Sequence, residues 1–224
     1  MAISSPTGIS DGNGIIPNTG IYLPTGISES LSGGAPAQTY ATLNPADMSS
    51  GGGIALSGGN LIVTRDTDNI FRSVRATIGQ SSGKWTFRVI ATSAAGGAGE
   101  YAVVGPANLS APLNDGTAYP GGDANGAGYF NFNGNILQNN VSSPFGVTWT
   151  TGDAILFAVD VDNGVLTTYK NGSTTPSGGP VSLGISGALY PMLSLYTASV
   201  LTFDAGETPF AWVPTGYNNG WYTP

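Results

Sequence analysis

The sequence predicts an all-β protein, a two-sheet antiparallel β-sandwich, and three observations predict it. Apolar and polar residues alternate with a period of two in the best-patterned segment, 84–91, as they do in a half-buried strand. Short turns rich in Gly, Asn and Pro separate the apolar segments, and no amphipathic pattern of about ten residues indicates a helix. Hydrophobic residues make up 40% of the chain, which is enough apolar surface for a core between two sheets.

The first clear strand, KWTFRVIA at 84–91, places alternate side chains on one face. Further strands are expected at 154–162, 165–170, 190–196 and 199–206. The pairs 163–164 and 171–172 are both Asn-Gly, which predicts hairpin turns because both residues tolerate positive φ. The side chains expected in the core are Trp85, Phe87, Phe157, Val159, Tyr190, Leu193, Leu195 and Phe203.

The chain divides into three predicted parts. Residues 1–53 form an extended arm and linker rich in Gly, Pro and Ser, residues 54–217 form the sandwich, and residues 218–224 form an aromatic tail. We expect the aromatic residues near the end, Trp221 and Tyr222 among them, to cover the open edge of their own sandwich. The alternative is that they dock to a neighbouring protein.

The arm repeats a short motif: PTGI occurs at 6–9 and again at 24–27, with PNTGI at 17–21. Proline favours extended backbone and glycine permits a turn after it, so no regular element is expected. Six isolated apolar residues are too sparse for a core of their own, and they suit an anchoring arm that lies in grooves of another subunit: Ile9, Ile16, Ile21, Tyr22, Leu23 and Ile27. The alternative is a solvated leader without a partner.

Composition excludes several classes of function. With no Cys and no His, the chain has no disulfide, no thiolate nucleophile, no imidazole base and no metal site ligated by these residues. Six Lys and Arg against 13 Asp and Glu give a net charge of −7, which argues against nucleic-acid binding. The N-terminus lacks a signal-peptide pattern, and no apolar run is long enough for membrane insertion. We expect a non-catalytic protein without cofactor or metal.

Most of the cations fall in one segment. Residues 61–90 have a net charge of +3 and contain Arg65, Arg72, Arg75, Lys84 and Arg88 against Asp66 and Asp68. Such a segment is either a docking patch or a set of strand positions that face solvent and neighbouring acids. The pattern favours the second interpretation.

Four pieces of sequence, in this order, resemble the SPRY domain family: SSGKWTFRV, GDAILFAVDVDNGVLTTYKNG, LYPMLSLY and LTFDAGETPFAW, with PTGY after the last. The resemblance covers residues 54–217. It implies a bent, jelly-roll-like two-sheet sandwich that binds partners through loops at one edge, without catalysis. Two features depart from the family pattern: Arg88 stands where an acidic residue is usual, and residues 96–128 are unusually rich in Gly, Ala and Asn.

Two carboxylates invite a catalytic interpretation. Asp160 and Asp162 lie two positions apart on a strand end, so their side chains share a face at a separation of roughly 7 Å, near that of glycosidase pairs. They also stand at a predicted hairpin, where Asp commonly caps the turn. The turn interpretation is favoured, so no catalytic residue is assigned. The sequence after Asp160 lacks the glycine spacing of a calcium loop, so no metal is expected there.

The favoured binding residues are polar and aromatic side chains in one loop-rich region, which resembles surfaces that recognise sugars or peptides. They are Asn114, Asp115, Tyr119, Asp123, Asn125 and Tyr129. Ordinary loop composition is the other explanation for them, and it is the one that the pattern favours.

These features together suggest a bacteriophage virion component, such as a capsid decoration, fibre or tail protein. Its arm would anchor to copies of itself or to other virion proteins, and its sandwich would be displayed towards a host-surface protein or glycan. The protein would be assembled in the host cytoplasm and would not be secreted by a signal peptide. The alternative is a cytoplasmic adaptor whose SPRY-like domain binds a peptide of a partner protein.

Overall fold

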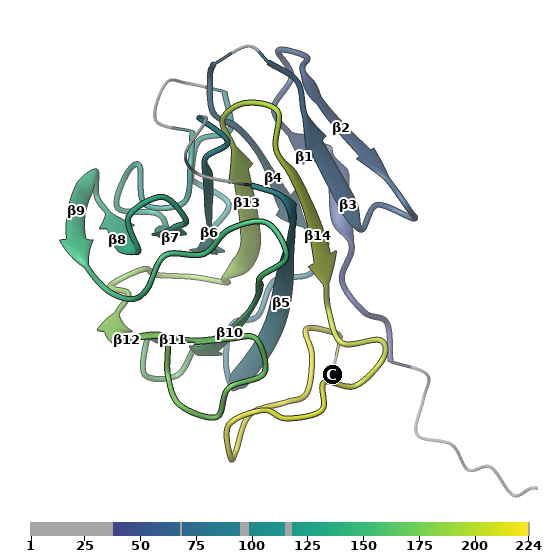
Figure 1. Cartoon of the computed structure of the whole chain (residues 1–224). Helices are drawn as coiled ribbons and strands as arrows, with labels where there is room; N and C mark the ends of the chain where they lie inside the picture. The colour runs from purple at the N-terminus through teal and green to yellow at the C-terminus, as the bar shows by residue number, and fades with distance from the viewer. Residues whose placement is uncertain (1–37, 68, 95–98, 115–117, 224) are drawn as a thin grey trace, which may run out of the picture. The chain divides into compact units, whose positions relative to one another are not determined.

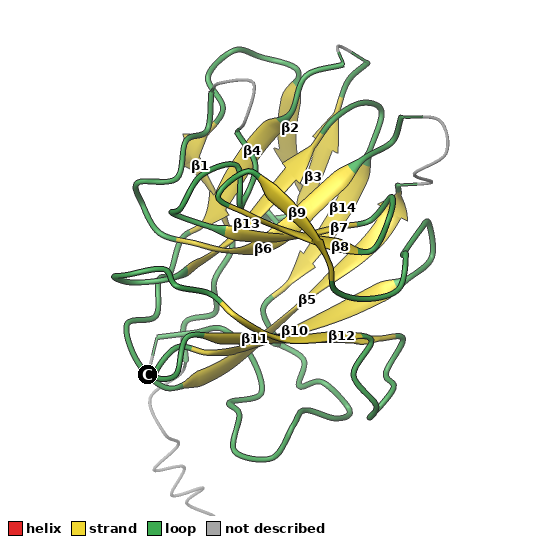
Figure 2. Cartoon of the chain, turned by 90° about the vertical axis from the view of Figure 1, so that its left-hand side faces the viewer, coloured by secondary structure: helices red, strands yellow, loops and turns green. Residues whose placement is uncertain are grey.

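Both predicted sheets are present in the computed structural model, which describes residues 38–67, 69–94, 99–114 and 118–223. Each sheet is antiparallel and contains seven strands within these residues. Figures 1 and 2 show the sheets as two stacked layers, so the predicted all-β sandwich is confirmed. No described segment is a helix long and apolar enough to cross a membrane. The six arm residues predicted to anchor the chain, and Asp115, lie outside the described residues.

The first sheet has the strand order β1-β4-β13-β6-β7-β8-β9. Its strands are β1 (Leu43–Met48), β4 (Arg72–Ala76), β13 (Tyr190–Leu195), β6 (Ala102–Ala107), β7 (Ala127–Phe130), β8 (Asn135–Gln138) and β9 (Val141–Pro144). Leu195 of β13 lies opposite both Arg72 of β4 and Ala102 of β6. Val103 of β6 lies opposite Phe130 of β7. This register brings the start of β4, the end of β13, the start of β6 and the end of β7 to the same end of the sheet.

The second sheet has the order β12-β11-β10-β5-β14-β3-β2. Its strands are β12 (Gly178–Ser182), β11 (Val165–Lys170), β10 (Ala154–Asp160), β5 (Lys84–Ser93), β14 (Val200–Asp204), β3 (Ile62–Arg65) and β2 (Ile54–Ser57). At the turn after β11, Asn171 and Gly172 have φ of 55° and 74°, as predicted. After β10, Gly164 has φ of 59° but Asn163 does not have a positive φ, because a longer connection, 161–164, joins the strands.

The inner faces of the sheets meet in an aromatic core. Phe87 of β5 and Phe157 of β10 stack with ring centroids 4.7 Å apart, and seven of the eight predicted core side chains are buried. The prediction for Tyr190 is wrong, since this residue is only half-buried. It lies three positions before Leu193 on β13, and strand alternation therefore turns it to the opposite face of the sheet.

The sandwich extends past both predicted boundaries. β1 lies within the segment predicted as arm and linker, and it pairs with β4 with Leu43 opposite Ala76. In the predicted tail, the Trp221 ring is fully buried, lies 5.5 Å from Phe87 and donates its Nε1–H to the carbonyl of Ile78 at 2.9 Å. Trp221 is thus a core residue, which corrects the expectation that the tail covers an edge.

The segment between β14 and Trp221 covers part of the outer face of the second sheet. Its apolar residues, including Phe210 and Trp212, pack on Leu156, Ala158 and Tyr169 of β10 and β11. This contact explains why residues 154–160 are apolar on both faces. The inner face meets the other sheet and the outer face meets this segment.

Candidate functional site

The loop between β6 and β7 crosses the outer face of the first sheet. Ala111 and Leu113 of the loop pack on Ala107 and Met192, which point outwards from β6 and β13. The carbonyl of Ala118 accepts hydrogen bonds from the hydroxyls of Ser73 and Ser194, which lie opposite each other on β4 and β13. The described part of this loop is therefore a packed layer on the sheet.

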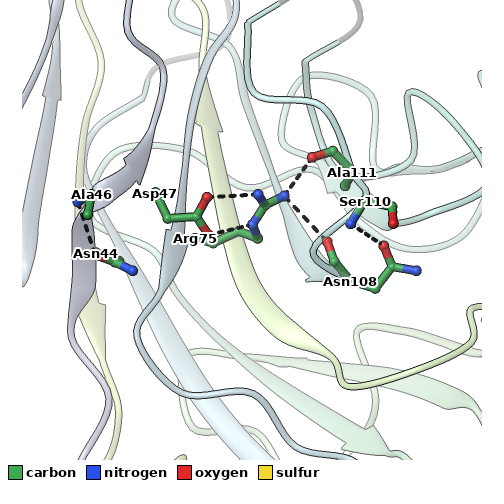
Figure 3. Close-up of polar contacts among 7 residues, drawn as sticks. All are labelled: Asn44, Ala46, Asp47, Arg75, Asn108, Ser110 and Ala111. Carbon is green, nitrogen blue, oxygen red and sulfur yellow. Dashed lines mark hydrogen bonds and ion pairs between the residues drawn. The ribbon is translucent and has the colours of Figure 1, made fainter.

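A buried arginine holds the start of the loop (Figure 3). The guanidinium of Arg75 donates to both carboxylate oxygens of Asp47, each at 2.8 Å, which joins β4 to β1. The same group donates to the carbonyls of Ala111 at 2.6 Å and Asn108 at 3.4 Å. One charged side chain therefore connects two strands and the loop.

The polar side chains predicted to bind a ligand form hydrogen bonds that shape this loop. The Asn114 side-chain oxygen accepts from the backbone N–H of Ser50 at 2.7 Å. Asp123 accepts from the backbone and the side-chain amide of Asn125 at 2.9 and 2.7 Å, and Asn125 accepts from Asn108 at 3.2 Å. These three predicted residues form contacts within the protein, which fits the favoured explanation, ordinary loop composition, better than a ligand site.

Tyr129 is not a surface residue, which corrects its prediction as a binding residue. It is fully buried on the inner face of β7, between Phe145 and Phe157, and its hydroxyl donates to the carbonyl of Val147. Burial raises the pKa of the Tyr129 hydroxyl to about 12, with a smaller contribution from the charge of Asp153. The neighbouring Phe130 has the opposite orientation and lies on the outer face.

A row of aromatic side chains crosses the end of the first sheet at which these four strand ends lie side by side. We call it the aromatic strip, and it consists of Phe71, Tyr101, Tyr119, Phe130, Phe132 and Tyr196. Four strands contribute to it: Phe71 precedes β4, Tyr196 follows β13, Tyr101 precedes β6 and Phe130 ends β7. Since strand side chains alternate, Tyr196, Tyr101 and Phe130 each lie on the face opposite to an adjacent core residue. Phe71 lies three positions before the core residue Val74, which also places it on the opposite face. Tyr119, a predicted binding residue, joins the strip from the loop.

The rings are evenly spaced and partly exposed. Phe71 lies 5.0 Å from both Tyr119 and Tyr196, and Tyr101 lies 5.6 Å from Tyr196 and 5.1 Å from Phe132, measured between ring centroids. Phe132 is 50% exposed, and the other rings are half-buried. Within the described part of the chain, no group hydrogen-bonds to the hydroxyls of Tyr101 and Tyr196. The strip can therefore offer both aromatic faces and hydroxyl groups to a partner.

The two carboxylates considered for catalysis hold turns instead. Asp160 forms an ion pair with Lys84 at 2.8 Å and accepts from the side-chain amide of Asn163 at 2.8 Å. Asp162 accepts from the backbone N–H of Gly83 at 2.8 Å. Burial disfavours the charged form of Asp160, but the hydrogen bonds from Lys84 and Asn163 outweigh it and hold the pKa of this carboxyl below its usual value.

The basic segment faces acids, as the favoured interpretation predicted. Lys84 pairs with Asp160, and Arg75 pairs with Asp47. Arg88 pairs with Asp204 at 2.6 Å and lies over the ring of Phe210, 4.9 Å from its centroid. These cations neutralise neighbouring carboxylates and do not form a separate basic patch. Among the described residues, no three acidic side chains gather in a way that could hold a metal ion.

A groove lies on the outer face of the second sheet. It has a volume of about 620 Å³ and is lined by residues that include Tyr40, Arg88, Ile90, Thr202 and Asp204. Arg88 and Asp204 of the groove form an ion pair with each other, and Thr202 hydrogen-bonds to Thr92 at 3.0 Å. This groove provides a comparison surface for tests of the aromatic strip.

Comparison with known proteins shows which family and which solved structures this chain resembles. The family model of the SPRY domain matches residues 84–208, which contain every member of the aromatic strip except Phe71. The crystal structure of the SPRY domain of human HERC1 matches with a TM-score of 0.59 at 18% sequence identity, and the match covers 74% of this chain and 99% of that one. A second crystal structure, of a human SPRY domain, matches with a TM-score of 0.49 at 16% identity over 68% and 95% of the two chains. The likeness to the HERC1 domain concerns the fold.

Proposed function

Because this chain belongs to the SPRY domain family, whose members are generally protein-interaction modules, we propose that it is a non-catalytic binding protein whose aromatic strip binds a partner protein. One observation carries the proposal. Four neighbouring strands of the first sheet each place an aromatic ring at the same end of the sheet and on the same outer face. Partly exposed Tyr and Phe side chains give large contact areas at a low cost in side-chain entropy.

The loop that crosses the sheet supports the strip. The loop is fixed on the sheet by hydrogen bonds from Ser73, Ser194 and Arg75. These bonds hold Tyr119 against Phe71. Because the rings are supported by strands and by a packed loop, binding would require little reorganisation. Preorganisation of this kind favours recognition of a specific partner.

The strip is tested by selecting binders from a displayed library of random peptides with the full chain. We expect Phe132→Ala to weaken the binding of selected peptides by about tenfold, because Phe132 is an exposed ring of the strip. Val141→Ala is the matched control, since Val141 is 60% exposed on β9 and lies outside the strip. Equal affinities of the wild type and the Phe132→Ala variant for every selected peptide would contradict the proposal.

We further propose that the domain is displayed on a larger assembly, such as a phage virion, with residues 1–37 as the anchor. The support is in the sequence: this segment repeats a Pro-Thr-Gly-Ile motif and carries isolated apolar residues with little charge. Residues 38–224 form one compact unit, which contains the sandwich. A host-surface protein or a glycan would then be the ligand of the displayed domain. The adaptor alternative is a monomer with a dispensable leader.

Light scattering after size-exclusion chromatography distinguishes these two functions. We expect the full chain to form an oligomer, and a variant that begins at Gln38 to be a folded monomer, because the anchor has been removed. Circular dichroism of the truncated variant provides the control for folding. A monomeric full chain would support the adaptor alternative and would contradict self-association through the arm.

A further inference from the structure

We propose that the segment bound by the aromatic strip is proline-rich, adopts the polyproline II conformation and runs across strands β4, β13, β6 and β7. This inference rests on the proposed function, since it names the chemistry of the partner at the same site. Three properties of the strip support it, namely the spacing of the strands that carry its rings, the hydroxyls of Tyr101 and Tyr196, and the absence of charge from its six side chains.

The spacing of the strands that carry the rings matches the repeat of a polyproline II helix. Neighbouring strands lie about 4.8 Å apart, so two strand spacings are about 9.6 Å. A polyproline II helix repeats every three residues at 3.1 Å per residue, or about 9.3 Å. Phe71, Tyr196, Tyr101 and Phe130 come from four successive strands, with neighbouring ring centroids 5.0, 5.6 and 5.5 Å apart. Prolines at positions i and i+3 would therefore meet rings on alternate strands.

The hydroxyls of Tyr101 and Tyr196 can supply hydrogen-bond donors to the backbone of such a segment. A polyproline II backbone has no internal hydrogen bonds, and proline has no N–H. The carbonyl groups of such a segment can therefore accept hydrogen bonds from donors on the protein. Tyr101 and Tyr196 stand on adjacent strands, and within the described part of the chain no group bonds to their hydroxyls. They can donate to carbonyl groups of a segment that lies over the neighbouring phenylalanine rings.

The chemistry around the strip favours this occupant over a charged peptide or a sugar. None of the six residues of the strip is charged. Recognition of a sugar would need several polar groups around the stacked ring. The Tyr119 hydroxyl already donates to Asn140 at 2.9 Å, and the Asn114 side-chain oxygen in the same loop already accepts from Ser50. An uncharged segment with an exposed polar backbone fits the strip better.

The test measures, by titration calorimetry with the full chain, the binding of an uncharged peptide of about twelve residues in which two of every three positions are proline. We expect saturable binding, and binding at least tenfold weaker when every proline is replaced by alanine. Tyr196→Phe, which keeps the ring and removes the hydroxyl, is expected to weaken binding several-fold. Tyr190→Phe, at the opposite end of the same strand, is the matched control and is expected to leave the affinity unchanged.

Two results would overturn the inference: equal affinity for the proline and alanine peptides, or binding that Tyr196→Phe and Phe132→Ala leave unchanged. Its failure is distinguishable from failure of the proposed function. If peptides selected from the random library contain no recurring proline but still depend on Phe132, the inference fails and the strip remains the binding site. If no selected peptide depends on Phe132, both fail.

Discussion

Replacing Trp221 with alanine is expected to lower the free energy of unfolding by about 3–5 kcal/mol, the range for truncating a fully buried large aromatic side chain. Its ring lies edge-on to Phe87 and within 6.5 Å of Trp85, so truncation leaves a cavity between the aromatic rings of β5 and the C-terminal segment. Trp221 also bonds through its backbone to Ala41 and Ala205, which ties the entry to β1 and the exit from β14 together.

Urea denaturation followed by circular dichroism measures this effect. Trp212→Ala is the matched control, because Trp212 lies in the same C-terminal segment but is only half-buried and packs on the outer face of the sheet. We expect a clearly smaller loss for the control. Equal losses for the two variants would mean that Trp221 does not complete the core.

Arg75→Met is expected to lower the free energy of unfolding by about 3–5 kcal/mol, because removing one partner of a buried ion pair leaves the other uncompensated. The Arg75 side chain is 5% exposed, and its loss would leave the Asp47 carboxylate and the Ala111 carbonyl without their donor. The start of the loop, 108–114, should also lose its attachment to β4. Hydrogen exchange of this loop is expected to accelerate more than that of the strands.

Arg88→Met gives the comparison for that experiment. Arg88 pairs with Asp204, but its side chain is 36% exposed, so we expect a loss of only about 1 kcal/mol. If Arg75→Met cost no more than Arg88→Met and left the exchange of the loop unchanged, the role of Arg75 as the support of the loop would be wrong.

The strands with clear local patterns could be predicted from the sequence alone. Alternation identified 84–91, and the Asn-Gly pairs located both hairpins, because these signals act between neighbouring residues. β1 could not be predicted in this way, since its pattern, LNPADM, shows no clean alternation and its strand state depends on pairing with β4. Trp221 could not be placed either, because a single aromatic residue carries no periodicity.

The aromatic strip shows a different limit of sequence reasoning. The loop around Tyr119 predicts this residue as a binding residue. Phe71, Tyr101 and Tyr196 are separated along the chain and become neighbours only through the strand order β4-β13-β6. A usable signal exists, because each of these three residues immediately precedes or follows a strand. Recognising it requires the order of the strands in the sheet, which the sequence of one chain does not supply. The polar residues that the sequence pattern favours, such as Asp123 and Asn125, are typical of turns.

Hydroxyl-radical footprinting of the full chain, free and bound to the tightest peptide selected from the random library, tests the central claim most directly. If the strip is the recognition surface, Tyr101, Phe132 and Tyr196 will be protected from oxidation when the peptide binds, and Trp212 on the second sheet will not. Protection confined to the groove around Tyr40 and Ile90, with the strip oxidised as in the free protein, would contradict the account.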